Sequence, residues 1–109
     1  MIITINELSS CSITVSFKNE KDQPVAPLSF TYRIDDLQSS TQLLGDALVL
    51  NPGVSYEIKI PSTTNNILIP ENIYESKKLT VKWTYTLDGI SKQGTDEFIY
   101  QVKNLTFLH

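Results

Sequence analysis

Nucleophilic catalysis by serine, threonine or cysteine needs a neighbouring base, and histidine is the usual one. The chain has 109 residues and a single histidine, His109, at its last position. Terminal residues have few packing partners, so a base there is poorly held. The single cysteine, Cys11, lies in an alternating polar and apolar segment and is predicted to be a small buried hydrophobic residue of a strand. We therefore predict no catalytic residue.

Metal binding needs ligands that the chain brings together. Zinc favours clustered cysteine and histidine, and here the one of each lies at opposite ends of the sequence. Calcium favours several oxygen donors in one loop, for which Asp35 and Asp36 with Asp46 are the best candidates. No Asp-x-Asp spacing supports such a site, so a solvated acidic loop is expected. The four glycines are scattered and form no phosphate-binding motif. The sequence thus predicts no metal ligand and no cofactor.

The charge balance argues against nucleic acid as a partner. Nine Lys and Arg residues stand against twelve Asp and Glu residues, which gives a net charge of −3. Nucleic-acid-binding domains instead carry a basic patch or stripe. Lys77 and Lys78 are the one adjacent basic pair, and Glu75 lies beside them. We expect this segment to be a solvated strand end.

The cysteine count and the apolar runs indicate a compartment. One cysteine allows no internal disulfide, which favours folding in a reducing cytoplasm. Residues 1–7 lack the basic and long apolar regions of a signal peptide. The longest apolar run is four residues, 47–50, far shorter than a membrane span needs. No membrane association is predicted.

The elements that would position any site are strands. Period-two alternation of apolar and polar residues, typical of half-buried strands, is faultless over residues 11–17, 28–35, 54–60 and 79–85. Weaker patterns predict an opening edge strand at 2–6, a short strand at 47–50 and a closing strand at 97–103. About seven strands without a helical period predict an all-β immunoglobulin-like or fibronectin III-like sandwich. It would span residues 1–104, with an apolar tail at 105–109.

Asp88 and Gly89 predict a two-residue hairpin turn, since this pair suits the primed turns. The resulting register sets Trp83 opposite Gly94, which leaves room for the indole in the core. It also sets Asp96 opposite Val81, on the core face. Either a bulge near Gly94 shifts the ladder, or the outer hairpin extends beyond the core. We predict the bulge.

The segment 68–74 contains a Leu-x-Pro-x-Asn-x-Tyr pattern. It resembles the crossing loop before strand F in fibronectin type III and related sandwiches. The resemblance implies that Tyr74 forms a tyrosine corner, with its ring on the core edge, and that Leu68 lies beneath the loop. Leu79 follows one position later than that pattern expects.

The two ends of the chain carry apolar residues that the sandwich does not need. If Phe98 and Val102 face the core, Leu105 and Phe107 have the opposite parity. The opening residues have no charge before Glu7. Uncovered apolar segments and edges favour contact with another chain. We predict a docking surface formed by Met1, Ile2, Ile3, Leu105, Phe107 and Leu108.

Several strand-like segments together carry a wider resemblance: TINE at 4–7, SITVSFK at 12–18, TYRIDD at 31–36, YES at 74–76, LTV at 79–81, DEFIY at 96–100 and VKNL at 102–105. Over nearly its full length the chain resembles small immunoglobulin-like structural proteins of tailed bacteriophages and prophages. The resemblance implies a non-enzymatic virion protein, assembled in the host bacterial cytoplasm and present in many copies. Its partners would be the portal, connector or major capsid protein, at the head–tail connector or on the capsid.

Two other classes of function remain open. An immunoglobulin-like binding module for a host-surface carbohydrate or protein would favour solvent-facing aromatic residues, particularly Trp83 or Tyr85. A small glycoside hydrolase would need two carboxylates that converge in a cleft, and nothing in the sequence favours that. The alternation around Trp83 favours a core position for its indole.

Overall fold

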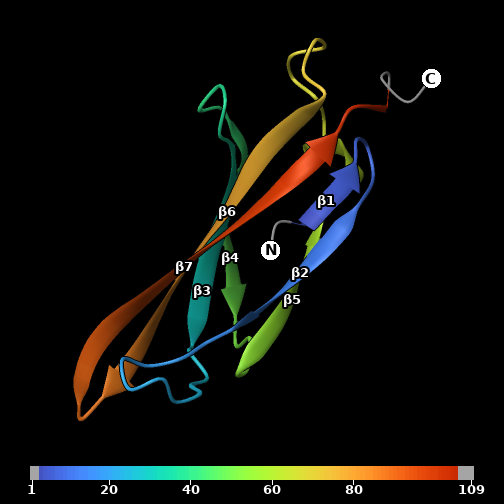
Figure 1. Ribbon diagram of the computed structural model, residues 1–109. Coiled ribbons are helices and arrows are strands. Elements are labelled where there is room, and N and C mark those ends of the chain that lie inside the picture. The colour runs from blue at the N-terminus through green and yellow to red at the C-terminus, as the bar shows by residue number, and fades with distance from the viewer. Residues whose placement is uncertain (1–2, 106–109) are drawn as a thin grey trace.

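Residues 3–105 are described in a computed structural model, and they form seven strands and one short 3-10 helix (Figure 1). The elements are β1 (Ile3–Asn6), β2 (Cys11–Ser16), β3 (Ser29–Asp36), β4 (Gln42–Leu50), β5 (Ser55–Ile60), η1 (Ser62–Thr64), β6 (Tyr74–Leu87) and β7 (Ile90–Lys103). The described residues include no helix long and apolar enough to cross a membrane.

The strands form two sheets. The larger sheet has the order β1-β7-β6-β3-β4, and the smaller sheet pairs β2 with β5. All pairs are antiparallel except β1 with β7, which is parallel. Two packed sheets with this division of strands form an immunoglobulin-like sandwich. The predicted all-β sandwich of about seven strands is therefore confirmed.

The core lies where the inward faces of the two sheets meet, because alternate side chains of each strand point to one face. Phe17 and Trp83 contact each other edge to face, with ring centroids 5.4 Å apart, and Phe30 lies 5.0 Å from Phe17. Trp83 is buried, as predicted. The buried hydrophobic residues are Val15, Phe17, Phe30, Ile34, Ile58, Ile60, Leu79, Val81, Trp83, Tyr100 and Val102.

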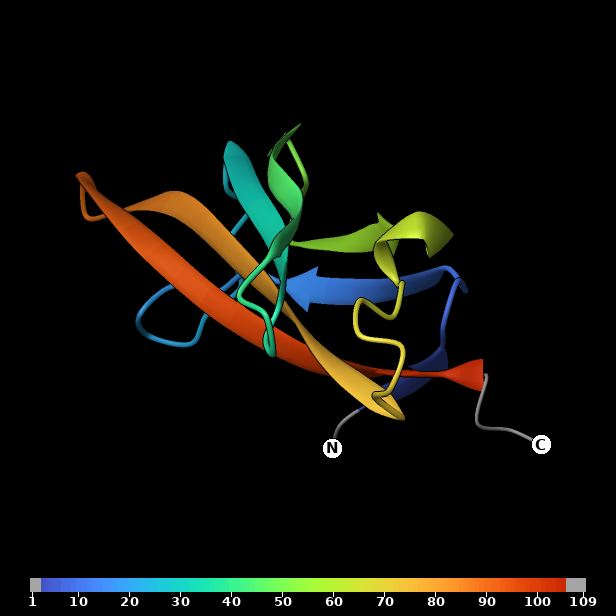
Figure 2. The same cartoon turned by 90° about the horizontal axis from the view of Figure 1, so that it is seen from above.

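The β6–β7 hairpin is much longer than predicted and forms an arm beyond the sandwich (Figures 1 and 2). β3 pairs with β6 only from Lys77 to Trp83, so residues 84–93 continue as a two-stranded ribbon. Asp88 and Gly89 both have positive φ, at 53° and 77°, as a primed turn requires. The molecule is correspondingly elongated, with principal extents of 57 × 22 × 20 Å.

The predicted bulge near Gly94 is wrong. The β6–β7 register runs without a shift from Leu87 opposite Ile90 to Tyr74 opposite Lys103. Asp96 does stand opposite Val81, but it is exposed, and β1 pairs with β7 only from Tyr100 to Lys103, so β7 is the edge of the sheet at Asp96. The alternative, an outer hairpin that leaves the core, is therefore correct.

Two strands begin earlier than the alternation indicates. β4 was expected at 47–50 but starts at Gln42, since Gly45 and Asp46 bulge opposite Arg33 and interrupt the period. β6 was expected at 79–85 but starts at Tyr74. The alternation missed its first residues because two of the inward-facing positions, Glu75 and Lys77, are charged rather than apolar. Those charged residues form the most unusual feature of the interior.

Candidate functional site

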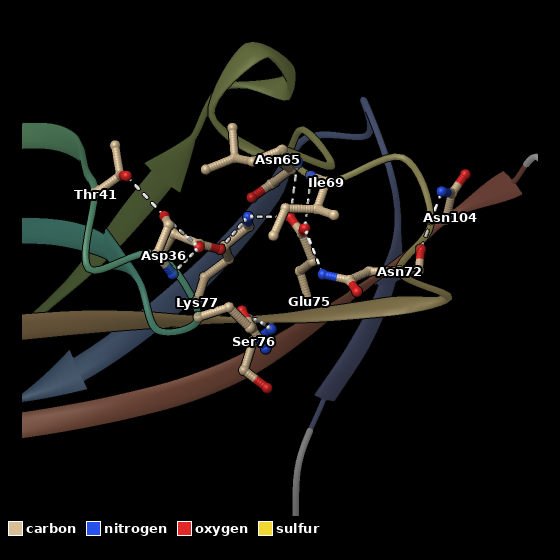
Figure 3. A network of polar contacts seen from close by, with 12 residues as sticks. Asp36, Thr41, Asn65, Ile69, Asn72, Glu75, Ser76, Lys77 and Asn104 are labelled. Atoms are coloured by element: carbon tan, nitrogen blue, oxygen red, sulfur yellow. Dashed lines mark hydrogen bonds and ion pairs between the residues drawn. The ribbon is translucent and has the colours of Figure 1, made fainter.

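Lys77 is the residue whose position differs most from expectation. It was predicted at a solvated strand end, but its side chain is 0% exposed, and so are those of Asp36 and Glu75. The Lys77 Nζ lies 2.7 Å from Asp36 Oδ1 and 3.2 Å from Glu75 Oε1 (Figure 3). These three residues are called the buried charge cluster below. Only mutual pairing makes such burial tolerable, because an isolated buried charge is very costly.

Two strands position the buried charge cluster. Glu75 and Lys77 are two residues apart on β6, so both point to the inner face that Leu79 and Val81 also occupy. Asp36 ends β3 and is the direct cross-strand partner of Lys77. The parity signal was therefore present in the sequence, since counting back from Leu79 places both charged residues inside.

Glu75 connects β6 to the segment that precedes it. Its carboxylate accepts hydrogen bonds from the backbone N–H groups of Leu68, at 2.7 Å, and Ile69, at 2.9 Å. Asn72 Nδ2 donates a third, at 3.0 Å. Burial by itself raises the pKa of Glu75, but these bonds and the one from Lys77 outweigh it, so the pKa lies below its usual value. Glu75 thereby holds the backbone of the loop at residues 68–72 in place.

Asp36 holds the turn between β3 and β4. Its Oδ2 accepts hydrogen bonds from the Ser39 backbone N–H, at 2.9 Å, and from Ser39 Oγ, at 2.7 Å. Its own N–H donates to the Thr41 carbonyl, at 2.8 Å (Figure 3). Burial raises the pKa of Asp36, but the hydrogen bonds from Lys77 and Ser39 together leave it below its usual value. Each oxygen of this carboxylate therefore has a defined donor.

The predicted tyrosine corner is wrong. Tyr74 is 46% exposed and Leu68 is also exposed, so neither packs on the core as the resemblance implied. Glu75 instead anchors the loop through its backbone, and Asn104 Nδ2 donates to the carbonyls of Pro70 and Asn72, both at 3.0 Å. The parity that places Tyr74 outside is the one that places Glu75 inside.

A neutral polar pair lies deeper in the same end of the sandwich. The Tyr100 hydroxyl donates to Asn65 Oδ1 at 2.8 Å, and Asn65 Nδ2 donates to the Ser9 carbonyl at 2.8 Å. Burial raises the pKa of the Tyr100 phenol. Asn65 Nδ2 also lies 3.6 Å from Cys11 Sγ, and burial raises the pKa of this half-buried thiol. Cys11 lies on β2 and packs against the core, as predicted, but it is only partly buried rather than buried.

The acidic residues considered for calcium point to separate partners. Asp35 forms an ion pair with Arg33 at 2.8 Å, Asp36 belongs to the buried charge cluster, and Asp46 is exposed on β4. Within residues 3–105, no three Cys, His, Asp or Glu side chains are grouped as metal ligands. His109 lies outside the described residues.

The predicted docking residues are described only in part. Ile3 begins β1, an edge strand of the larger sheet, and pairs with Tyr100 of β7. Leu105 is partly exposed, and its N–H donates to Glu7 Oε1 at 2.9 Å. Met1, Ile2, Phe107 and Leu108 lie outside the described residues.

Apolar side chains are also exposed on β4, the opposite edge strand of the larger sheet. Leu48 and Leu50 are 62% and 67% exposed. They alternate with the inward Val49, which packs against the core. The predicted short strand at 47–50 lies within β4, but this surface was not predicted, because alternation alone does not show which strand is at an edge.

Comparison of the chain with protein-family models, curated proteins and solved structures finds no match.

Proposed function

We propose that this chain is a non-enzymatic structural protein of a tailed-phage particle. It is assembled in the host bacterial cytoplasm and docks at the head–tail connector or on the capsid through sheet edges and terminal segments. The resemblance to small phage structural proteins, over nearly the full length of the sequence, supports the biological setting. The single observation that supports docking is the apolar, unpaired edge at the end of β4.

The two halves of β4 differ in how readily their free edge could pair with a strand of another chain. Gly45 and Asp46 form a bulge with a charge, two devices that discourage pairing at an edge. The half from Ala47 to Leu50 carries no charge, pairs regularly with β3, and exposes Leu48 and Leu50. An open strand edge with apolar side chains is a template for another chain.

The shape suits a passive, many-copy role. The 57 × 22 × 20 Å body places the β6–β7 arm far from the buried charge cluster, so opposite ends are available to different neighbours. In this proposal the partners are the portal, connector or major capsid protein. The terminal residues, Met1 to Ile3 with Leu105, Phe107 and Leu108, are a second docking segment.

The alternative of a host-surface binding module receives no specific support. It would favour a solvent-facing Trp83 or Tyr85, but Trp83 is buried and its Nε1 donates to the Lys18 carbonyl at 3.2 Å. The Tyr85 hydroxyl accepts a hydrogen bond from the Glu20 N–H at 3.0 Å. Both polar groups form hydrogen bonds within the chain, so the structural role is the one function proposed.

The test is mass spectrometry and imaging of purified particles from the culture that produces the chain. We expect the chain in the particles at a fixed copy number, and at a connector or capsid position. The variant Leu48→Lys/Leu50→Lys should lower its incorporation at least tenfold, a loss that corresponds to about 1.4 kcal/mol of docking free energy. Ser12→Lys, at an exposed position of β2, is the matched control and should incorporate normally. Absence of the chain from purified particles contradicts the proposal.

A further inference from the structure

We propose that Lys77 and Asp36 join in an intramolecular amide bond between β6 and β3, formed autocatalytically with Glu75 as the proton carrier. The inference is independent of the proposed function, since it concerns the chemistry of the interior. Its basis is that an amine, a carboxyl group and a second carboxyl group meet where all three side chains are inaccessible to solvent. A lysine amine can act as a nucleophile once it is neutral.

The first argument is position. The Lys77 Nζ lies 2.7 Å from Asp36 Oδ1, and the carboxyl carbon Cγ is one bond further. The two residues are direct partners in the β3–β6 ladder, so the backbone holds them together. Reacting atoms held at near-contact distance gain a large effective concentration, and this replaces an external activating group.

The second argument is burial. The side chains of Lys77, Asp36 and Glu75 are all 0% exposed. Burial by itself favours the neutral forms of an amine and an acid, whereas the hydrogen bonds to Asp36 keep its carboxyl charged at rest, so the neutral pair is the minor, reactive state. Transfer of one proton along the hydrogen bond from Nζ to Oδ1 gives both neutral groups at once. The same absence of solvent removes the water that would reverse the reaction.

The third argument is the division of roles between the two oxygens of Asp36. Oδ2 faces two donors, the Ser39 N–H at 2.9 Å and Ser39 Oγ at 2.7 Å. Two donors on one oxygen stabilise the negative charge that develops there when a nucleophile adds to the carboxyl carbon. Oδ1 faces the lysine instead, and is the oxygen that receives protons.

The reaction balances without a further reactant. The Nζ lone pair adds to Cγ, the Nζ–Cγ bond forms, and negative charge develops on Oδ2. Glu75 Oε1, which lies 3.2 Å from Nζ, takes a proton from the nitrogen and passes it to the protonated Oδ1. The Cγ–Oδ1 bond then breaks, water leaves, and the Cγ–Oδ2 double bond re-forms. Glu75 ends as the carboxylate it began as.

The test is the intact mass of the purified chain under denaturing conditions. We expect a mass lower than that of the unmodified chain by one water molecule. Protease digestion followed by tandem mass spectrometry should yield a branched peptide that joins the segments containing Lys77 and Asp36. The unmodified mass in the wild-type chain overturns the proposal, and so does a loss of water without the branched peptide.

Variants assign the roles. Lys77→Met and Asp36→Ala should each restore the full mass. Lys78→Met is the matched control, because the neighbouring Lys78 is partly exposed and close to Glu97, and it should retain the loss of water. Glu75→Gln should slow formation of the branched peptide at least tenfold. Equal rates in Glu75→Gln and wild type would remove Glu75 from the mechanism. The wild-type mass decides the proposal even if a variant does not fold.

Discussion

The indole of Trp83 lies against the backbone of Gly94, its direct partner across the β6–β7 ladder. A Cβ at position 94 would overlap Trp83 Cε2 and stand 2.6 Å from its Nε1. Glycine is required here for space rather than for backbone conformation. Trp83 in turn packs on Phe17 and donates to the Lys18 carbonyl, so it closes the core where the arm begins.

The variant Gly94→Ala should lower the free energy of unfolding by about 1–3 kcal/mol, because the indole must move from its packed position. Urea denaturation followed by tryptophan fluorescence measures the loss. The cost should shrink when Trp83→Phe is also present, since the smaller ring leaves room. Strictly additive effects of the two substitutions would contradict a direct contact.

Acid should destabilise the fold through Glu75. Its folded-state pKa is below the ordinary 4.5, so the stabilisation is complete above that pH and is lost as the pH falls through the lowered value. The free energy of unfolding, measured in urea from pH 7 to pH 3, should fall at the acidic end. Glu75→Gln should flatten this decline, whereas the exposed Glu57→Gln should not. Because backbone and Asn72 donors carry much of the effect, the prediction does not depend on the proposed amide.

The pair of Tyr100 and Asn65 should be sensitive to loss of either partner. Asn65→Ala leaves the buried Tyr100 hydroxyl and the Ser9 carbonyl without their hydrogen bonds. The expected cost is about 1–3 kcal/mol of unfolding free energy. Combining it with Tyr100→Phe should recover part of that cost, because one orphaned group is then removed. Thermal or urea unfolding of the three variants provides the comparison.

Cys11 should react slowly with thiol reagents in the folded protein. Burial raises the pKa of its thiol, which lowers the thiolate fraction at neutral pH. Alkylation by iodoacetamide, followed by mass spectrometry, should be at least tenfold slower in the native chain than in urea. Equal rates in the two conditions would show that the thiol is accessible.

Much of the fold followed from local pattern. Alternation located the strands that carry Val15, Phe30 and Val81, and the Asp88–Gly89 turn placed Trp83 opposite Gly94 in the correct register. The burial of charged residues at inward positions did not follow from that pattern. Lys77 was assigned to solvent because its partner Asp36 lies 41 positions away, on another strand. Periodicity indicates which face of the strand a side chain occupies, but it does not identify the side chain that contacts it from another strand.

The same limit explains the loop before β6. Tyr74 was given a core role by resemblance, although its parity is the outward one, and Glu75 takes the inward place. The bulge at Gly45 and Asp46 disguised the first half of β4. Leu48 and Leu50 indicate a docking edge only because β4 is the last strand of its sheet, and the sequence does not show the order of the strands.

The parallel pairing of β1 with β7 has a mechanical consequence. Ile3 is level with Tyr100 and Asn6 with Lys103, so the chain enters this ladder at one end and leaves it at the other. Tension between the two ends of the described segment therefore acts along the strands and shears the ladder. Its hydrogen bonds must yield together rather than one after another, and forced unfolding is governed by that single barrier. A component under sustained load would gain endurance from this arrangement without any gain in equilibrium stability.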